Sequence, residues 1–391
     1  MKSITRLIGK ALSKPIINKM LKEDVNLVFP GKIDQKNTSS HEITINDWSF
    51  FWDILVGYDL GFAESYIQGK WDHQNLTNLF KFFSDKTSKN KRPSIGNFAP
   101  KKIYARFIQK IKSTNTISQS KKNISDHYDL SNEFFMAFLD PTMTYSCGIF
   151  KNNDSLEDAQ HNKLNSLIQA SKVKNNQKVL EIGCGWGSLT KKIAYDHNAE
   201  VTSITLSKQQ YQYANELFDN TSLSSNINLK LTDYRLIEGK FDHIFSIEML
   251  EAVGHKGTQD FFQKCASLLN HDGTLQIQVI TIPHERYNAY KNNCDFIQRY
   301  IFPGGLLLSL EHIRESAKSA GFKIYKEYSI GPHYATTLNH WKNNFLNNYE
   351  KINKLGFPET DIRRFLYYFS YCEGAFLSGV IDDYQISLRK T

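Results

Sequence analysis

Short apolar runs alternate with amphipathic segments over the second half of the chain. The runs are rich in Val, Ile and Leu and predict strands, while the segments between them carry apolar residues at helical spacing. This alternation is typical of an α/β fold with a mostly parallel sheet covered on both faces. We expect strands at residues 178–182, 200–204, 227–231, 243–247 and 274–280, and helices at 188–197, 208–218 and 259–269.

The N-terminal part follows a different pattern, with short strands first and helical spacing from Asp47 onward. The expected elements are strands at 25–29 and 42–45, helices at 76–83 and 101–111, and a polar loop at 87–100. A polar stretch without periodicity follows, and we place the domain boundary there. The predicted organisation is a smaller, mainly helical α+β domain at 1–112, a linker at 113–122 and a larger α/β domain at 123–391.

Residues 1–22 form a basic amphipathic pattern that Pro15 interrupts. The segment is either a helix that lies on an anionic membrane surface or an ordinary surface helix of the first domain, and the sequence leaves both open. It lacks the continuous apolar stretch of a signal peptide. No apolar run approaches the ~18 residues of a membrane-spanning helix. We therefore expect a cytoplasmic protein rather than an integral membrane protein.

Composition narrows the class of protein further. A chain of 391 residues that is 40% hydrophobic has enough apolar side chains for real cores, which excludes global disorder. The formal charge of +8 admits nucleic acid or an anionic membrane as a partner and does not choose between them. The 26 Phe, 20 Tyr and 5 Trp indicate large cores, and a subset suits a pocket for an apolar or cationic species.

The cysteines stand far apart and lack a metal-binding spacing, so we expect no metal site and a reducing compartment. They are Cys147, Cys184, Cys265, Cys294 and Cys372.

A glycine loop follows the first predicted strand of the larger domain. The strand is followed by Gly183-Cys-Gly-Trp-Gly187 and then by a helix. A glycine motif between a strand and a helix is typical of a ligand-binding loop. The spacing is neither that of a dinucleotide fingerprint nor that of a phosphate-binding P-loop. With Glu181 before it, the loop resembles the first motif of class I S-adenosylmethionine-dependent methyltransferases.

This resemblance implies a set of cofactor-binding residues after successive strands, where an open α/β sheet binds its ligand. Glu181 is expected to hold the amino group of the cofactor, and the residues after the second strand replace the acid that many relatives place at the ribose. Residues after the third strand are expected to contact the adenine. The expected cofactor-binding residues are Tyr145, Ser146, Glu181, Gly183, Gly185, Gly187, Thr205, Leu206, Ser207, Gln210, Asp233 and Tyr234.

Several segments together resemble one subgroup, the cyclopropane-fatty-acyl-phospholipid synthases and their lipid-methylating relatives. The resemblance covers nearly the whole chain, and the combination of motifs is specific. It is carried by Leu60–Trp71, His127–Phe135, Leu139–Cys147, Leu180–Gly187, Val201–Gln210, Tyr300–Gly305, Tyr334–Leu338 and Tyr367–Phe376. The resemblance implies a class I methyltransferase Rossmann-like sheet with helical lid insertions.

The resemblance also implies a reaction. In that family the cis double bond of a phospholipid acyl chain attacks the methyl group of S-adenosylmethionine, and a bound bicarbonate removes a proton so that a cyclopropane closes. Such a site must be dry, must hold a base and must admit a long apolar chain. The residues implied to hold the bicarbonate are Cys147, Glu251 and Tyr334, with the backbone at Ile280. Gln278 is a further catalytic candidate.

Two positions depart from the family pattern. Many members carry His where this chain has Gln278, and many have Glu-His where this chain has Glu251-Ala252. Gln donates a hydrogen bond to an oxyanion but cannot titrate. The product is therefore left open between a cyclopropane and a methylene-branched or methyl-branched chain.

Residues 283–308 and 340–388 exceed a minimal methyltransferase sheet and are aromatic. We expect them to cover the cofactor site and to line an acyl tunnel, with most of their rings in ordinary helix packing. An unsaturated phospholipid at the inner face of the membrane is the expected partner, with peripheral contact and with homo-oligomerisation left open. The rival prediction is a small-molecule N-methyltransferase. No clustered basic stripe or base-reading module supports nucleic acid as the substrate.

Overall fold

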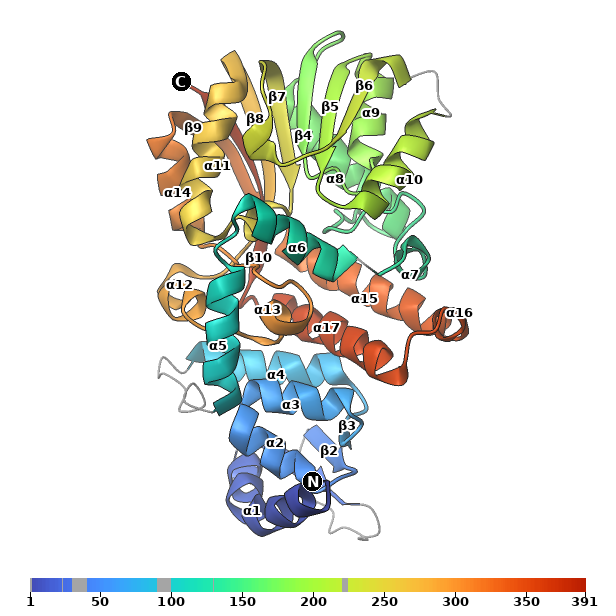
Figure 1. Ribbon diagram of the computed structural model, residues 1–391, viewed down its shortest axis with the longest axis vertical. Coiled ribbons are helices and arrows are strands. Elements are labelled where there is room, and N and C mark those ends of the chain that lie inside the picture. The colour runs from blue at the N-terminus through green and yellow to red at the C-terminus, as the bar shows by residue number, and fades with distance from the viewer. Residues whose placement is uncertain (1, 23, 30–40, 90–99, 129, 220–223) are drawn as a thin grey trace.

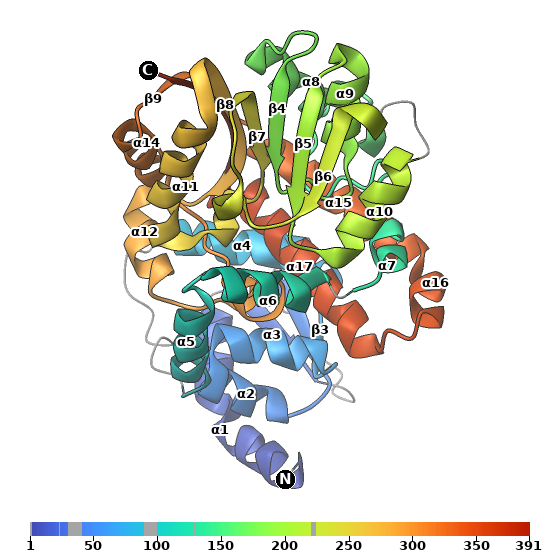
Figure 2. The same cartoon turned by 45° about the horizontal axis from the view of Figure 1, so that its top comes forward.

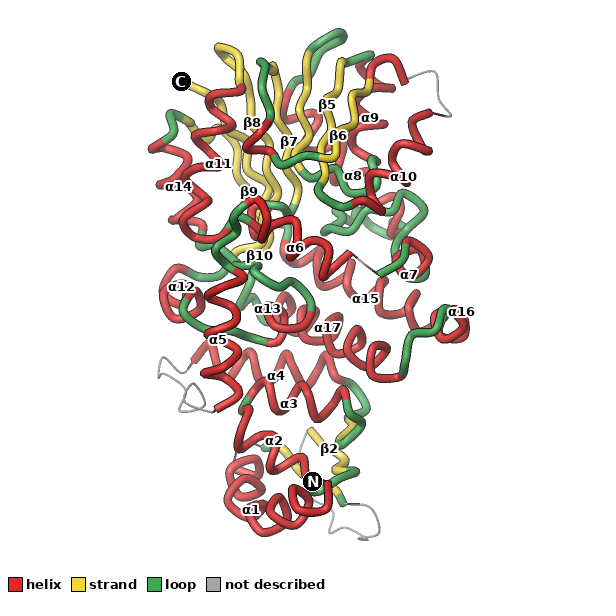
Figure 3. Tube along the Cα trace, in the orientation of Figure 1, coloured by secondary structure: helices red, strands yellow, loops and turns green. Residues whose placement is uncertain are grey.

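The computed structural model describes residues 2–22, 24–29, 41–89, 100–128, 130–219 and 224–391. Figure 1 shows an elongated molecule with three levels. A large sheet and its helices form one end, a layer of helices lies in the middle, and the N-terminal elements form the other end. Figure 3 shows that most of the strands gather at one end, whereas the middle layer is almost entirely helical.

The large sheet has seven strands in the order β6-β5-β4-β7-β8-β10-β9. The first five of these pair in parallel, and β10 runs antiparallel to both of its neighbours. Helices pack against the strands on the flanks of the sheet. The strands are β4 (Lys178–Ile182), β5 (Glu200–Thr205), β6 (Ile227–Leu231), β7 (Phe241–Ile247), β8 (Leu269–Thr281), β9 (Phe322–Ser329) and β10 (Asp382–Lys390). The helices are α8 (Leu156–Ser171), α9 (Ser188–His197), α10 (Lys208–Asp219), α11 (Gly254–Leu268) and α14 (Leu310–Ser319).

The mostly parallel α/β sheet confirms the predicted fold class, and all five predicted strands are present. Two strands were missed. β9 is an edge strand with many charged residues, so it lacks the apolar run that marks a buried strand. β10 lies within the range predicted as a lid, and this assignment was wrong. Its Asp383 and Gln385 are polar, yet both are buried. Gln385 donates to the Gln278 side chain and to the carbonyl of Lys163, and one oxygen of Asp383 accepts from Gln278, whereas its other oxygen has no partner among the described residues.

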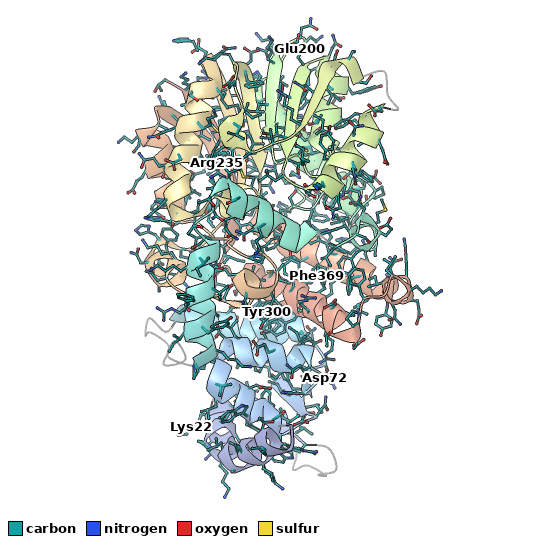
Figure 4. All side chains as sticks on the ribbon, viewed as in Figure 1. Lys22, Asp72, Glu200, Arg235, Tyr300 and Phe369 are labelled. Atoms are coloured by element: carbon teal, nitrogen blue, oxygen red, sulfur yellow. The ribbon has the colours of Figure 1, made fainter. Side chains whose placement is uncertain are left out.

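The middle layer consists of α12 (His284–Lys291), α13 (Phe296–Tyr300), α15 (Gly331–Asn347), α16 (Tyr349–Lys354) and α17 (Glu359–Leu377). Helix α17 packs against α15 on one side and against α3 and α4 of the N-terminal part on the other. Buried rings dominate this packing, and Phe369, labelled in Figure 4, contacts Phe138, Phe345 and Phe365. A buried polar contact joins the layers, because Thr77 donates to Glu373 over 2.6 Å.

The N-terminal end contains a three-stranded sheet and helices, as predicted for a mainly helical α+β unit. Its elements are α1 (Lys2–Lys22), β1 (Val25–Val28), β2 (His41–Ile45), α2 (Ser49–Gly57), α3 (Asp59–Ile67), β3 (Trp71–Asp72) and α4 (Leu76–Lys89). The expected interruption at Pro15 is wrong, because α1 continues through it. Contacts of α1 with α2 and β1 hold the helix together despite the missing backbone donor of Pro15.

Two helices connect this end to the sheet: α5 (Pro100–Lys112) and α6 (Ile117–Tyr128), followed by the short α7 (Asn132–Met136). The segment 113–122, predicted as a linker without regular structure, is helical from Ile117 onward. Asn115, just before α6, donates to the carbonyl of Gly304. The predicted loop at 87–100 is helical up to Lys89, and its residues 90–99 lie outside the described residues. Within the motif His127–Phe135, Asp129 also lies outside them, as do the side chains of 124–128. The domain boundary stays a prediction.

Candidate active site

A cavity of about 3310 Å³ opens where the parallel strands of the sheet end. Open α/β sheets bind their ligands at this edge. Pockets for small ligands measure about 300–1,000 Å³, so this cavity has room for a cofactor and for a second, long molecule. Its walls come from the glycine loop, from the ends of β5 and β7, from α5 and α6, and from the middle layer. In Figure 2, α6 crosses the front of this region beneath the sheet.

The glycine loop forms a tight turn between β4 and α9. The backbone N–H groups of Gly183 and Cys184 both donate to the carbonyl of Ile204 over 3.0 Å, which fixes the loop to the end of β5. Gly185 has a φ of 54°, and a Cβ there would meet no atom within 4 Å, so this face of the loop is open. Gly187 has a φ of 96°, and a Cβ there would come within 2.6 Å of the Phe218 ring. The turn therefore requires glycine for two different reasons.

Glu181 lies behind the loop as predicted, on the cavity wall. Its carboxylate accepts a hydrogen bond from Thr190. Desolvation by burial raises the pKa of Glu181 to about 7, while the bond from Thr190 opposes that rise. An enclosed carboxyl of this kind suits the ammonium group of an amino-acid moiety.

The predicted residues after β5 form one hydrogen-bonded turn. Thr205 donates to the Gln210 side chain over 2.8 Å and accepts from the Ser207 backbone over 3.1 Å. Ser207 in turn accepts from the backbone of Gln210. Thr205, Leu206 and Gln210 line the cavity, whereas Ser207 is not among its lining residues and supports the turn instead.

Asp233 and Tyr234 follow β6 and also line the cavity. Both oxygens of Asp233 accept from the Arg235 guanidinium, over 2.7 and 2.6 Å. Arg235 also donates to the carbonyl of Asn115 over 2.8 Å and so holds the start of α6 over the site (Figure 4). The sequence pattern did not reveal Arg235, because a single basic residue after a strand has no distinctive spacing.

Tyr145 and Ser146 line the cavity from the segment before α8. The Tyr145 hydroxyl donates to that of Tyr368 on α17 over 3.0 Å. The Ser146 hydroxyl accepts from the ammonium group of Lys163 over 2.8 Å. Lys163 is fully buried, and this desolvation lowers its pKa.

The centre of the candidate site is the carboxylate of Glu248, which directly follows β7 on the cavity wall. One oxygen accepts from the Cys147 backbone over 2.8 Å and from the Gln278 amide over 2.7 Å. The other oxygen accepts from the Tyr334 hydroxyl over 2.7 Å. Glu248 has a φ of 48°, in the left-handed region that disfavours a side chain. Strain of this kind is found at sites where function demands a particular geometry.

Glu251 lies one turn further along, also on the cavity wall. One oxygen accepts from the backbone of Ile280 over 2.6 Å. The other oxygen is shielded from solvent and has no partner among the described residues. Desolvation, followed by the charge of Glu248, raises the pKa of Glu251 to about 8. Glu251 is therefore predominantly neutral at pH 7. Burial also raises the pKa of the neighbouring Glu248, while its three donors and the charge of Lys163 oppose that rise.

Buried polar side chains orient this network from below. The side-chain amide of Gln385 on β10 donates to the side-chain oxygen (Oε1) of Gln278 over 3.1 Å. This bond directs the side-chain amino group of Gln278 toward Glu248. Asp383, on the same strand, accepts from the same amino group over 3.1 Å. Burial, with the charge of Glu248, raises the pKa of Asp383 well above its ordinary value.

The residues present do not fit the predicted bicarbonate. Four donors of this site are already engaged: Cys147 N–H, Gln278 and Tyr334 by Glu248, and Ile280 N–H by Glu251. The Cys147 thiol is fully buried and donates to the carbonyl of Gly148 over 3.2 Å. Neither Cys147 nor Gln278 is among the residues that line the cavity. The chain supplies its own carboxylate where an anion was expected.

The lid segments divide between the two roles expected of them. Phe345, Phe365 and Phe369 are buried in helix packing. Other rings of the two segments line the cavity: Tyr290, Phe302, Tyr367, Tyr368, Tyr371 and Phe376.

The sheet, its glycine loop and the polar residues after successive strands define a class I S-adenosylmethionine-dependent methyltransferase. The sequence model of the mycolic acid cyclopropane synthetase family matches residues 115–386. The chain belongs to this family and is an enzyme that transfers methyl groups from S-adenosylmethionine to lipids.

Its relatives are named for more than one lipid product. The tuberculostearic acid methyltransferase UfaA1 of Mycobacterium tuberculosis is 34% identical over 345 residues, which cover 84% of this chain and 78% of the relative. The cyclopropane-fatty-acyl-phospholipid synthase of Escherichia coli (strain K12) is 31% identical over 350 residues, 88% of this chain and 87% of the relative. The crystal structure of the mycolic acid cyclopropane synthase CmaA1 complexed with SAH and CTAB is 31% identical, with a TM-score of 0.65 over 69% of this chain and 98% of that chain.

Sequence reasoning missed Glu248, Lys163, Asp383 and Arg235. For Glu248 a signal was available, since it is the first residue after a predicted strand and so falls at the ligand-binding edge of the sheet. For Lys163 and Asp383 no local signal exists, because a lysine in a helix and an aspartate near the end of the chain are normally exposed.

Proposed function

We propose that this enzyme transfers a methyl group from S-adenosylmethionine to a cis double bond of an unsaturated phospholipid acyl chain and closes a cyclopropane. The observation that carries the proposal is the Glu248 carboxylate, held by three donors beside the glycine loop in an aromatic-walled cavity. An amine lone pair attacks the methyl group without forming a carbocation, so its methylation does not need a base enclosed beside an apolar channel.

The residues of the glycine loop and of the turns after β5 and β6 suit S-adenosylmethionine, which supplies the methyl group when bound. Glu181 faces the amino-acid end, and Gly185 leaves its side of the loop free of side-chain atoms. Thr205 and Gln210 lie where a ribose is expected, and Asp233 with Tyr234 lies where an adenine is expected. The glycine loop is not followed by the Lys-Ser/Thr pair of a P-loop, which agrees with a cofactor that carries no phosphate.

The middle layer provides the apolar channel. Phe302, Tyr368 and Phe376 line the same cavity as Glu248, and Tyr334 stacks on Phe376 with a centroid distance of 4.5 Å. Aromatic faces stabilise a neighbouring cation and exclude water, which would otherwise quench a carbocation. This wall therefore suits an alkyl chain that becomes positively charged during the reaction.

In the proposed reaction Glu248 is the base, because ring closure requires the removal of a proton. One alkene carbon forms a bond to the methyl carbon as the sulfur–carbon bond breaks, and the other alkene carbon becomes cationic. Glu248 then removes a proton from the new methyl group, and the released C–H electrons form the third side of the ring. Tyr334, Gln278 and the Cys147 backbone hold the carboxylate in place for this step.

A branched product is the second candidate, because Gln278 and Ala252 depart from the family pattern. If a hydride shifts before deprotonation, loss of a proton from the new methyl group gives a methylene branch instead of a ring. Both products add one CH2 to the chain, so the same reaction machinery serves either.

The phospholipid is reached at a membrane surface, in this proposal by a cytoplasmic protein in peripheral contact with the inner face. Among the described residues, no helix combines the length and apolarity needed to cross a bilayer. Helix α1 exposes Ile4 and Leu7 beside its basic residues. In this proposal α1 is one of the contacts with the membrane.

The test is incubation of the purified protein with S-adenosylmethionine and vesicles of unsaturated phospholipid, with the acyl chains read by mass spectrometry. A gain of one CH2 per chain is expected, and NMR then distinguishes a ring from a methylene branch. Unchanged chain masses would refute the proposal. Methylation of small amines with no change in the lipid would support the N-methyltransferase alternative.

A further inference from the structure

Helix α5 presents four apolar side chains to solvent and buries two of its polar ones. Ile103, Tyr104, Phe107 and Ile111 are 54%, 59%, 63% and 49% exposed. We call these four side chains the α5 face. On the opposite side, Lys102, Ala105 and Gln109 are 2%, 2% and 7% exposed. A surface helix of a globular protein normally shows the reverse arrangement.

Polar contacts fix α5 in this orientation. Lys102 donates to Asp59 over 2.6 Å and to the carbonyl of Cys294 over 2.7 Å. Gln109 donates to the carbonyl of Gly305 over 3.1 Å. A buried lysine needs such partners, so rotation of the helix to bury its apolar side would leave a charge unpaired. The outward apolar face is therefore built into the fold.

Positive charge accompanies the α5 face. Helix α5 contains no acidic residue. Arg106 and Lys110 are exposed next to Phe107 and Ile111. An apolar stripe flanked by exposed cations is complementary to an anionic lipid surface, where the rings enter the acyl boundary and the cations meet headgroup phosphates.

The α5 face borders the catalytic cavity. Ile103, Phe107 and Lys110 line the cavity, as do the exposed Leu55 of the adjoining α2 and the exposed Tyr58 just after that helix. Figure 1 shows α5 on the flank of the molecule, between the N-terminal end and the sheet. An acyl chain that leaves a bilayer at this face meets the same cavity that contains Glu248.

We propose that the α5 face docks on an anionic phospholipid bilayer and places the cavity opening against the lipid. The docking itself stands on the helix geometry, and only the entry of an acyl chain rests on the function proposed above. The charge argument favours a bilayer over a second copy of the chain, because two α5 helices face to face would bring their Arg106 and Lys110 side chains together.

The first experiment measures binding of the full chain to sedimented vesicles of phosphatidylglycerol and phosphatidylcholine, with I103S/F107S as the test variant. The variant is expected to lose about tenfold or more in partitioning because two exposed apolar side chains no longer enter the lipid. Tyr195→Ser is the matched control, since Tyr195 is 75% exposed on α9, far along the chain from α5. Equal partitioning of the parent and I103S/F107S would overturn the proposal.

Two further variants test the contact with lipid and the role of charge separately. In Phe107→Trp, the fluorescence emission of the new tryptophan is expected to shift to the blue when anionic vesicles are added. R106Q/K110Q is expected to bind these vesicles more weakly, and its binding is expected to depend less on salt concentration. No shift for Phe107→Trp, or a change of oligomeric state in I103S/F107S with unchanged vesicle binding, would assign the face to another partner and overturn the proposal. None of these measurements depends on methyl transfer, so they can still be interpreted if the proposed enzymatic function is refuted.

Discussion

Replacing Glu248 with glycine tests the internal base directly. The substitution removes the carboxylate and frees three donors that now point at it: Cys147 N–H, the Gln278 amide and the Tyr334 hydroxyl. The backbone tolerates the change, because Glu248 has a φ of 48°, where glycine is favoured. The variant is therefore a folded protein with an empty anion site of known donors.

The loss of a positioned base costs about 10²–10⁴-fold in rate. We expect E248G to lose methyl(ene) transfer by about that factor in buffer freed of carbon dioxide. Added bicarbonate, which fits the three freed donors, is expected to restore part of the rate to the variant. The parent is expected to be insensitive to bicarbonate, because its own carboxylate already engages those donors.

The assay follows transfer of the labelled methyl carbon of S-adenosylmethionine into vesicle lipid, with and without bicarbonate, for the parent, E248G and E248Q. E248Q keeps the size of the side chain but not its charge, so it is the control that loses rate without rescue. A parent enzyme that requires bicarbonate, or a folded E248G that retains the parent rate in its absence, would refute the assignment of Glu248 as the base.

Three further outcomes are expected. Glu251→Gln should retain most of the turnover, because Glu251 is predominantly neutral at pH 7 and Gln keeps an acceptor for the Ile280 N–H; loss of turnover with intact S-adenosylmethionine affinity, measured by calorimetry, would instead give Glu251 a part in proton transfer. The same variant changes the pH dependence of stability: the folded pKa of Glu251 is about 8 against an ordinary 4.5, so its contribution to the free energy of unfolding is complete below pH 4.5 and is lost as the pH rises through 8. The melting temperature of Glu251→Gln relative to the parent should therefore rise between these limits, and a constant difference would contradict the pKa assignment. Gly187→Ala should lower the melting temperature more than Gly239→Ala, because both positions have a positive φ but only Gly187 places a Cβ within 2.6 Å of a neighbour; backbone strain alone costs about 1–3 kcal/mol, and equal losses would contradict the packing argument.

The parallel strands and the glycine loop could be predicted from the sequence because their signals are local. Apolar runs mark β4 to β8, and three glycines between a strand and a helix mark the loop. The antiparallel strand β10 could not be found this way, since Asp383 and Gln385 look like surface residues until their partner Gln278 is known.

The sequence indicated some of the residues that lie at the candidate site, but neither Glu248 nor the contacts between them. Glu251, Ile280 and Tyr334 all lie on the cavity wall, as the family resemblance implied. That Tyr334 donates to Glu248 rather than to a bound anion depends on two segments 86 positions apart in the chain meeting in space. Spacing along a sequence carries no information about such a contact, so only the folded geometry reveals it.

The position of β10 has a consequence for the order in which the candidate site is completed during synthesis of the chain. This strand is inserted between β8 and β9, and it supplies the Gln385 amide that orients Gln278 and the Asp383 carboxyl beside it. Residues 382–390 are translated after every other element of the sheet. The side chains that orient Gln278 from β10 therefore join the sheet only after its other strands have been synthesised.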